Sequence, residues 1–259
     1  GAEKFFNIKC RASGLRPDAA VIVTTVRAMK LHSGGYRVVP GKPLPEAMLA
    51  ENPGDVRAGA GNLAKQIDNV QRHGVTPVVC INRFATDHDS EVAAIAEVAA
   101  AAGCRAAEST HFAHGGAGAE ALARAVIEAA EEPSQFRFLY DLEQPIKAKI
   151  EAIATAIYGA DGVTYEAAAD AQIRRFEAAG YGALPICMAK THLSLTDDPK
   201  RLGAPRGFTV RVREVRASIG AGFIYPLLGE MRTMPGLPSH PAAERVDIDP
   251  ETGEVTGLS

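Results

Sequence analysis

Apolar and polar positions alternate with two different periods along the first half of the chain. Short apolar, β-branched runs favour strands, whereas apolar residues spaced three and four apart favour helices. The predicted strands are residues 18–26, 78–81 and 104–108. The predicted helices start near Asn62, at Asp89 or Ser90, and near Ala119. Because strands and helices alternate, we expect a parallel, doubly wound α/β sheet.

The apolar pattern also predicts how these elements are covered. The first strand is apolar at nearly every position, which is typical of a strand covered on both faces. Glycine and proline are frequent between Gly34 and Gly54, so we expect a long loop there. The third helix is expected to bury Leu122, Val126 and Ile127.

A different pattern follows Pro133. Isoleucines at 146, 150, 153 and 157 share one helix face, and residues 164–179 predict a second helix. Residues 208–215 alternate faces with arginines outward, as in a strand, and residues 246–255 favour a hairpin. The second part of the chain is therefore predicted to be mixed α/β.

Composition narrows the class of protein. The 259 residues are 46% hydrophobic and 23% charged, which suits one large domain or two smaller ones. We expect two, residues 1–135 and 136–259. The net charge of −3 gives no basic field for nucleic acid, and no apolar run reaches the roughly 18 residues of a membrane helix. The four cysteines are far apart, so we expect reduced thiols in a cytoplasmic protein.

Two predicted strands end in loops that could form a ligand site, because ligands bind beyond the carboxyl ends of parallel strands. The first loop contains Asn82, Phe84 and Asp87, and the second contains Phe112. Phe84 and Phe112 could hold a flat heterocycle between their rings, with Asn82 and Asp87 as polar contacts. The alternative is that both rings pack in the core and that Asn82 and Asp87 serve as strand-end and helix-capping residues.

Other motifs carry less specific signals. Gly115–Gly118 could take an anion at a helix N-terminus, but glycine-rich turns are also common without ligands. His111 and His114 have no obvious third metal ligand nearby, so no metal site is predicted. The apolar turn of Met234, Pro235, Gly236 and Leu237 could line a purine pocket or pack on its own domain.

The sequence lacks the usual motif for binding nucleotide phosphates. No G-x-x-x-x-G-K-[ST] phosphate loop occurs. The segment NRFATD, residues 82–87, has some likeness to the N-K-x-D guanine motif of GTPases, but its Asp comes two residues late.

Several motifs in order resemble one enzyme family. GAEKFF, IKCR, SGLRPDAAV, INRFATD, FAHGGAG, LPICMAKT, DDPKRLGAPRGF, GAGFIYPL and TMPGLP follow one another as in formate–tetrahydrofolate ligases, also called formyltetrahydrofolate synthetases. The resemblance extends over the whole chain. Members of the family are about twice as long, and this chain resembles their C-terminal portion.

The resemblance implies ATP-dependent ligation of formate to tetrahydrofolate through formyl phosphate, giving 10-formyltetrahydrofolate. It implies a partial P-loop-NTPase-like sheet, lacking the phosphate-loop strand, then a mixed α/β domain. By resemblance, Phe84 and Phe112 stack the pterin, Asp87 lies near the folate head group with Asn82 at the pocket, and Met234 to Leu237 lie near adenine. The family uses MgATP and tetrahydrofolate as substrates, is activated by monovalent cations and forms homotetramers.

The phosphate loop and the formyl phosphate residues would belong to a part of the family that this chain lacks, namely an N-terminal half. The chain alone is therefore expected to be incomplete for catalysis. Two alternatives stay open. One is a non-catalytic folate- or nucleotide-binding module without a P-loop, and the other is a guanine-binding enzyme that uses Asn82 and Asp87.

Overall fold

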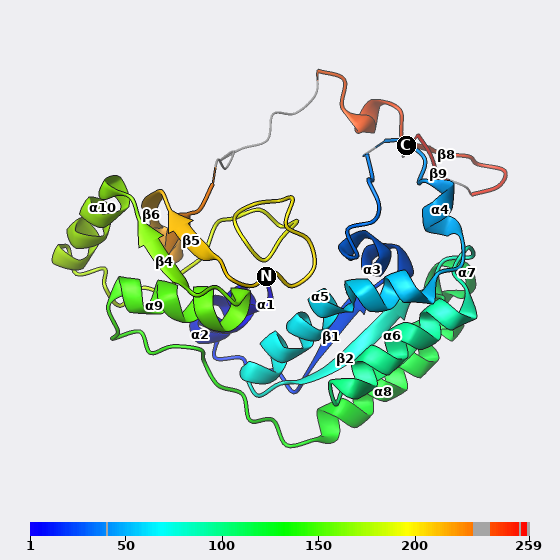
Figure 1. The fold of residues 1–259 in the computed structure, drawn as a ribbon, viewed down its shortest axis with the longest axis horizontal. Helices are drawn as coiled ribbons and strands as arrows, with labels where there is room; N and C mark the ends of the chain where they lie inside the picture. The colour runs from blue at the N-terminus through cyan, green and yellow to red at the C-terminus, as the bar shows by residue number, and fades with distance from the viewer. Residues whose placement is uncertain (40, 230–238, 254, 258–259) are drawn as a thin grey trace.

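Three parallel strands form the sheet in the first part of the chain. They are β1 (Ala19–Thr24), β2 (Thr76–Asn82) and β3 (Arg105–Ser109), and they lie side by side in that order (Figure 1). The structure, a computed structural model, describes residues 1–39, 41–229, 239–253 and 255–257. The α/β class and the parallel sheet predicted from the sequence are confirmed.

Helices cover both faces of this sheet. On one face, three helices pack on one another: α3 (Val26–His32), α5 (Pro53–Arg72) and α6 (Asp89–Ala101). On the other face, α8 (Glu120–Glu131) contacts all three strands. The middle strand β2 is buried from its second to its sixth residue, as expected for a strand covered on both faces. The remaining short elements are α1 (Ala2–Lys4), η1 (Phe5–Cys10), α2 (Arg11–Ser13), α4 (Glu46–Leu49), α7 (His111–His114) and η2 (Gly115–Ala119).

Helix α5 begins nine residues before the predicted start at Asn62. Its N-cap is Asn52, whose side chain accepts a hydrogen bond from the Asp55 N–H at 3.0 Å. Gly59 lies within the helix and is needed for close packing: a Cβ there would lie 1.8 Å from the Met29 carbonyl oxygen of α3. Glycine here permits two helices to touch rather than ending one of them.

Two predictions of burial were wrong. On β1, Val21 is 43% exposed and Val23 is 64% exposed, so this edge strand is covered well on only one face. On α8, Ile127 is 60% exposed, although Leu122 and Val126 are partly buried as predicted. One face of the sheet at its β1 edge therefore carries exposed apolar side chains.

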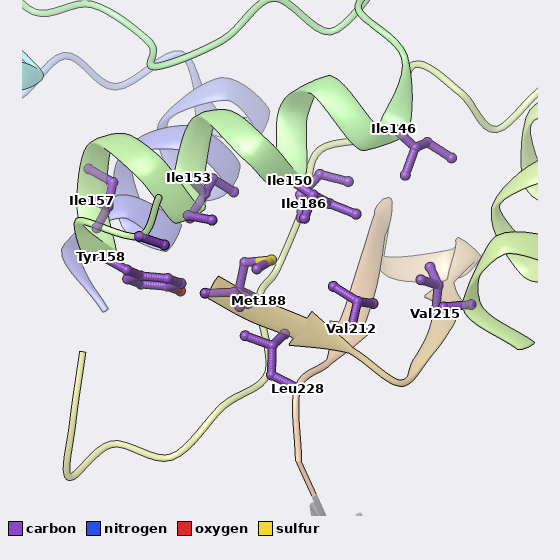
Figure 2. Close-up of a cluster of buried hydrophobic side chains, with 14 of the residues drawn as sticks. Ile146, Ile150, Ile153, Ile157, Tyr158, Ile186, Met188, Val212, Val215 and Leu228 are labelled. Atoms are coloured by element: carbon purple, nitrogen blue, oxygen red, sulfur yellow. The ribbon is translucent and has the colours of Figure 1, made fainter. Parts of the chain in front are cut away.

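The second part of the chain forms its own core from short elements (Figure 2). The four isoleucines predicted to share a helix face do so, and all are buried. The predicted helix 164–179 is partly wrong, because its first two residues lie in a strand that pairs with another in parallel. The elements are α9 (Ile146–Ala152), η3 (Ile153–Tyr158), β4 (Gly162–Tyr165), α10 (Ala167–Ala178), β5 (Thr209–Val212), β6 (Glu214–Ser218), η4 (Ile219–Ala221), β7 (Phe223–Leu227), η5 (Ala242–Glu244), β8 (Asp247–Ile248) and β9 (Val255–Thr256).

Strand pairing makes this part mixed, as predicted. Strands β4 and β5 pair in parallel, β6 and β7 pair antiparallel, and β8 and β9 form the expected hairpin. The predicted strand 208–215 is interrupted at Arg213, which separates β5 from β6. Each of these sheets has two strands, so packing of α9, η3 and α10 supplies much of the buried surface.

The N-terminal helices connect the two parts. Phe6 and Cys10 pack with Val70, Val75 and Phe136 in a small core beneath the first sheet. All four cysteines are free thiols. Among the described residues, no helix combines the length and apolar character required to span a bilayer.

Candidate functional site

The carboxyl ends of β2 and β3 lie next to each other, which is the condition for their loops to form one site. Asn82 is paired in register with Ser109, and the Arg83 N–H continues the ladder by donating to the Ser109 carbonyl oxygen at 3.0 Å. The loops that follow these strands consequently start from neighbouring positions. The half-buried amide of Asn82 makes no hydrogen bond to any residue that the structure describes, so it is available to a ligand.

Asp87 closes the loop after β2. Its Oδ2 accepts the Phe84 N–H at 2.9 Å, and its own N–H donates to the Phe84 carbonyl oxygen at 3.0 Å. The side chain is 8% exposed, and burial raises the pKa of this carboxyl even though the Phe84 N–H and the charge of Arg27 oppose that shift. Asp87 therefore fixes the turn that presents Phe84. The helix cap itself is His88, one residue before the predicted start.

Arg83 ties the same loop to its surroundings. Its guanidinium donates to both carboxylate oxygens of Glu108 at 3.1 and 3.2 Å and to Asp89 at 2.5 Å. These acidic partners raise the pKa of Arg83 further above its usual value. The same side chain also donates to the Asp87 carbonyl oxygen at 3.3 Å, so both ends of the turn are held.

Phe84 is 38% exposed, and a residue that sequence reasoning missed covers one side of its ring. The guanidinium carbon of Arg27, in the first turn of α3, lies 3.8 Å from the ring centroid of Phe84. Its Nη2 also donates to the Thr86 hydroxyl at 3.1 Å. The signal in the sequence was an arginine three residues after the end of β1, where a third strand end joins the same edge.

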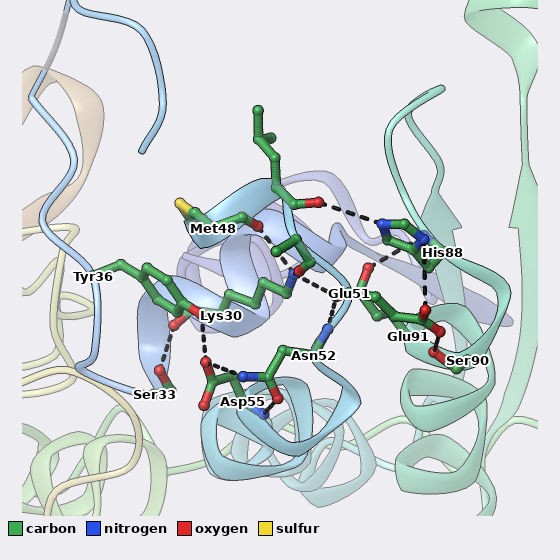
Figure 3. Close-up of polar contacts among 12 residues, drawn as sticks. Lys30, Ser33, Tyr36, Met48, Glu51, Asn52, Asp55, His88, Ser90 and Glu91 are labelled. Carbon is green, nitrogen blue, oxygen red and sulfur yellow. Dashed lines mark hydrogen bonds and ion pairs between the residues drawn. The ribbon is translucent and has the colours of Figure 1, made fainter. Parts of the chain in front are cut away.

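A buried ion pair joins the two helices that follow β1 and β2 (Figure 3). Lys30 of α3 and Glu91 of α6 contact each other, and each is 1% exposed. Glu91 also accepts the N–H groups of Asn52 at 2.9 Å and His88 at 3.2 Å, while Lys30 donates to the carbonyl oxygens of Met48 and Ala50. Burial would raise the pKa of Glu91, but these donors outweigh it and the pKa is lowered.

The loop after β3 is built differently. Phe112, in the short helix α7, is 95% exposed, so its ring touches almost nothing, Phe84 included. The loop is closed at its base, where the Thr110 N–H donates to the Gly118 carbonyl oxygen at 2.9 Å. A Cβ on Gly118 would lie 2.6 Å from the Thr110 carbonyl carbon, so only glycine fits there without a shift.

The two histidines of this loop have local partners. His111 Nδ1 is 2.9 Å from the Ser109 hydroxyl, and His114 Nδ1 is 3.0 Å from the Thr110 hydroxyl. No group of three or more potential metal ligands occurs within the described ranges. Gly115–Gly118 forms the 3₁₀ turn η2 before α8 rather than the first turn of that helix. The predicted adenine residues Met234, Pro235, Gly236 and Leu237 lie outside the described residues.

The loops at the carboxyl ends of β2 and β3 can therefore offer a flat ligand the phenyl rings of Phe84 and Phe112 and the amide of Asn82. Phe84 is held by Arg27 and by the Asp87 turn, whereas Phe112 stands free on the neighbouring loop. Two aromatic rings and an amide suit the recognition and orientation of a planar group.

Comparison with known proteins identifies relatives over the full chain. The family model described as formate–tetrahydrofolate ligase matches residues 1–259. The chain is 64% identical over 259 residues to a formate–tetrahydrofolate ligase of Saccharopolyspora erythraea, covering 100% of this chain and 46% of that protein. It is 60% identical over 267 residues to formate–tetrahydrofolate ligase 3 of Rubrobacter xylanophilus and 56% identical over 258 residues to the ligase of Cutibacterium acnes. Each of these alignments also covers 100% of this chain and 46% of the relative. The chain thus spans about half the length of the curated relatives it matches.

Proposed function

Because this chain belongs to the formate–tetrahydrofolate ligase family, we propose that it supplies the reduced-folate pocket of an ATP-dependent ligase that joins formate to tetrahydrofolate. The family resemblance predicted from the sequence motifs is confirmed by the match over the whole chain. The observation that carries the proposal is that the strand ends of β2 and β3 are adjacent in register and present Phe84 and Phe112 from neighbouring loops.

The pterin of tetrahydrofolate would enter between these two loops. Phe84 offers the ring face that Arg27 leaves uncovered, and the exposed ring of Phe112 can come to rest on the other side of the pterin. Stacking of this kind contributes about 0.5–1.5 kcal/mol per ring pair beyond the area buried. Asn82 is the polar partner for the pterin edge, since its amide has no other bond to a described residue. Asp87 acts at the pocket mainly by shaping the turn, with one carboxylate oxygen already occupied by the Phe84 N–H.

In the proposed reaction, formate takes the γ-phosphoryl group of MgATP to give formyl phosphate, and N10 of tetrahydrofolate then attacks its carbonyl carbon. The products are 10-formyltetrahydrofolate, ADP and phosphate. This chain's part is to bind and orient the folate so that N10 faces the formyl group. We place the phosphate-binding loop outside these residues, because the motif does not occur in them.

The shape of the sheet agrees with a larger, P-loop-like assembly. Strand β1 is at the edge of the described sheet, and its Val21 and Val23 side chains are exposed. Further parallel strands from the rest of the ligase would cover that edge, which is how residues 1–135 would complete one domain, with residues 136–259 forming another. Met234–Leu237 would contact adenine. We further propose a cytoplasmic homotetramer that a monovalent cation activates.

Guanine recognition is a weaker alternative on physical grounds. A guanine-reading Asp must offer its carboxylate to the base, whereas Asp87 is 8% exposed and one of its oxygens accepts the Phe84 N–H. The other alternative, a folate-binding module without catalysis, differs from the ligase only in turnover. The two are therefore separated by an activity measurement and not by binding.

Two measurements test the proposed function. Calorimetric titration of the chain with a reduced folate should show binding at one site, while GTP should show none. ADP formation by the longer protein that contains this chain should require both formate and tetrahydrofolate, and the chain alone should form no ADP. Absence of folate binding would contradict the proposed folate pocket. ADP formation at the same rate without formate and tetrahydrofolate would contradict the proposed ligase activity.

A further inference from the structure

Arg27 occupies an unusual place for a surface arginine. It follows the edge strand β1, is half-buried, and lies against the ring of Phe84 at 3.8 Å from guanidinium carbon to centroid. Its Nε is buried and has no hydrogen-bond partner within the described part of the chain. It forms no ion pair with any carboxylate that the structure describes, and its one hydrogen bond goes to the Thr86 hydroxyl. This cation is therefore partly desolvated, and its compensating interactions are with the Phe84 ring, the Thr86 hydroxyl and the charge of Asp87.

The cost of that burial indicates what the side chain does. A guanidinium that only improved solubility would extend into water, where its five N–H donors are all satisfied. Against a phenyl face it gains a cation–π attraction instead, and it closes that face to any other partner. Its charge also reaches Asp87, whose pKa it lowers against the dominant effect of burial. Arg27 thus contacts the ring and also acts on the turn that carries it.

We propose that Arg27 is a positioning residue of the folate pocket, which holds the Phe84 ring in its stacking orientation and leaves a single ring face for the pterin. This inference rests on the proposed function and adds a residue from a third strand end to it. The order of layers would be guanidinium, Phe84 ring, pterin and Phe112 ring. A cation on the far face also draws electron density from the phenyl ring, which favours stacking with an electron-rich reduced pterin.

Position and charge make separate contributions that two substitutions can resolve. Arg27→Met keeps an unbranched apolar stem over the ring but removes the charge and the bond to Thr86. Arg27→Lys keeps a cation near the ring but loses the flat stack. If Arg27 holds the ring as proposed, Arg27→Met should weaken reduced-folate binding about 3- to 30-fold and Arg27→Lys by less than about 3-fold.

The KM values for the two substrates distinguish a positioning role of Arg27 from a general loss of structure. In the intact ligase that contains this chain, Arg27→Met should raise KM for tetrahydrofolate while leaving KM for ATP and the melting temperature nearly unchanged. In a Phe84→Ala background, Arg27→Met should weaken folate binding by less than about 2-fold, because the ring it acts through is gone. Arg57→Met is the matched control, since Arg57 is a 51% exposed arginine of α5 paired with Glu97.

Each outcome decides one of the two proposals. If Phe84→Ala weakens folate binding but Arg27→Met does not, the role of Arg27 is wrong and the folate pocket stands. Equal increases in KM for ATP and tetrahydrofolate would also overturn the positioning role. If the unmodified protein binds no reduced folate, or Phe84→Ala changes nothing, the proposed function fails and this inference fails with it.

Discussion

The two loops of the candidate site differ in how far they are formed before any ligand arrives. The loop after β2 is held by the Asp87 turn, by Arg83 and by Arg27, and its Phe84 ring is 38% exposed. The loop after β3 is closed at its base by the Thr110–Gly118 hydrogen bond, and its Phe112 ring is 95% exposed. One aromatic ring is thus fixed in advance, and the other is free to move onto the ligand.

This difference has an energetic meaning for binding. A preformed contact costs little ordering entropy when the ligand binds, whereas a free side chain must lose rotamer freedom of about 0.5–1.5 kcal/mol. In return, Phe112 has almost its whole surface left to bury against the ligand. We therefore expect Phe84 to set where the pterin lies and Phe112 to contribute more of the binding free energy.

Disruption of the buried Lys30–Glu91 ion pair should give the largest loss of stability. Lys30→Met leaves Glu91 buried without its cation, and breaking a buried pair in this way costs about 3–5 kcal/mol. Urea unfolding measures the loss. The double variant Lys30→Met/Glu91→Gln should recover part of it, because the remaining side chain is neutral. A loss below about 1 kcal/mol for the single variant would show that the pair does not hold the α3–α6 contact.

Removal of the free ring should affect binding and not folding. Phe112→Ala should weaken folate binding by about 1–3 kcal/mol, since a stacked aromatic contact is lost, while the free energy of unfolding changes by less than about 0.5 kcal/mol. The matched control is Ile127→Ala on α8, another exposed apolar residue, which should change neither quantity much. A large loss of stability with unchanged folate affinity would make Phe112 a structural residue instead.

A substitution at the base of the loop after β3 should destabilise the protein more than one at its exposed tip. Gly118→Ala places a Cβ 2.6 Å from the Thr110 carbonyl carbon, and overpacking of this kind costs about 1–3 kcal/mol. Gly116→Ala is the control, because a Cβ there meets nothing within 4 Å. Thermal unfolding of the two variants should differ clearly. Equal melting temperatures would mean that the loop accommodates the methyl group by moving as a whole.

The smallest effect concerns the charge of Asp87. Its pKa is raised mainly by burial, so the ionised carboxyl costs folding free energy, and any stability it gives is present below the unfolded pKa and is lost as pH rises. Asp87→Asn keeps an oxygen for the Phe84 N–H and should be as stable as the parent or up to about 1 kcal/mol more stable at pH 7. The gain should shrink as pH falls toward the range where Asp is protonated.

Urea unfolding between pH 4.5 and pH 7 measures this trend. A variant that is clearly less stable at pH 7 than the parent would show that attraction between the carboxylate and Arg27 outweighs burial. The conformation of the β2 loop would then depend on charge more than on the hydrogen bonds of its turn.

Local patterns predicted the three strands of the first sheet and the helices α5, α6 and α8, but not α3, whose first residue Val26 was assigned to the preceding strand. The alternating strands and helices, the isoleucine face of α9 and η3 and the hairpin of β8 and β9 are all short-range signals, and the structure has them. The start of α5 was not predictable in this way. Gly59 resembles a helix breaker in the sequence, and only its contact with the Met29 carbonyl shows why glycine is required.

The contacts that could not be predicted from the sequence join residues that are far apart along the chain. Lys30 and Glu91 are distant in sequence, and nothing in either segment indicates that they meet in the core. The contact between Arg27 and Phe84 likewise depends on the register of β1 against β2. The site aromatics were found because parallel strands bring their carboxyl ends to one edge. The residues that support them depend on packing that no local pattern encodes.

The central claim is that Phe84 and Phe112 both contact the bound pterin, and magnetic resonance can observe this directly. With ring-labelled phenylalanine in the chain and a reduced folate bound, intermolecular NOEs to the pterin should come from two rings. One set should vanish in Phe84→Leu and the other in Phe112→Leu. Pterin NOEs that persist in both variants, or that arise from other phenylalanines, would contradict the account.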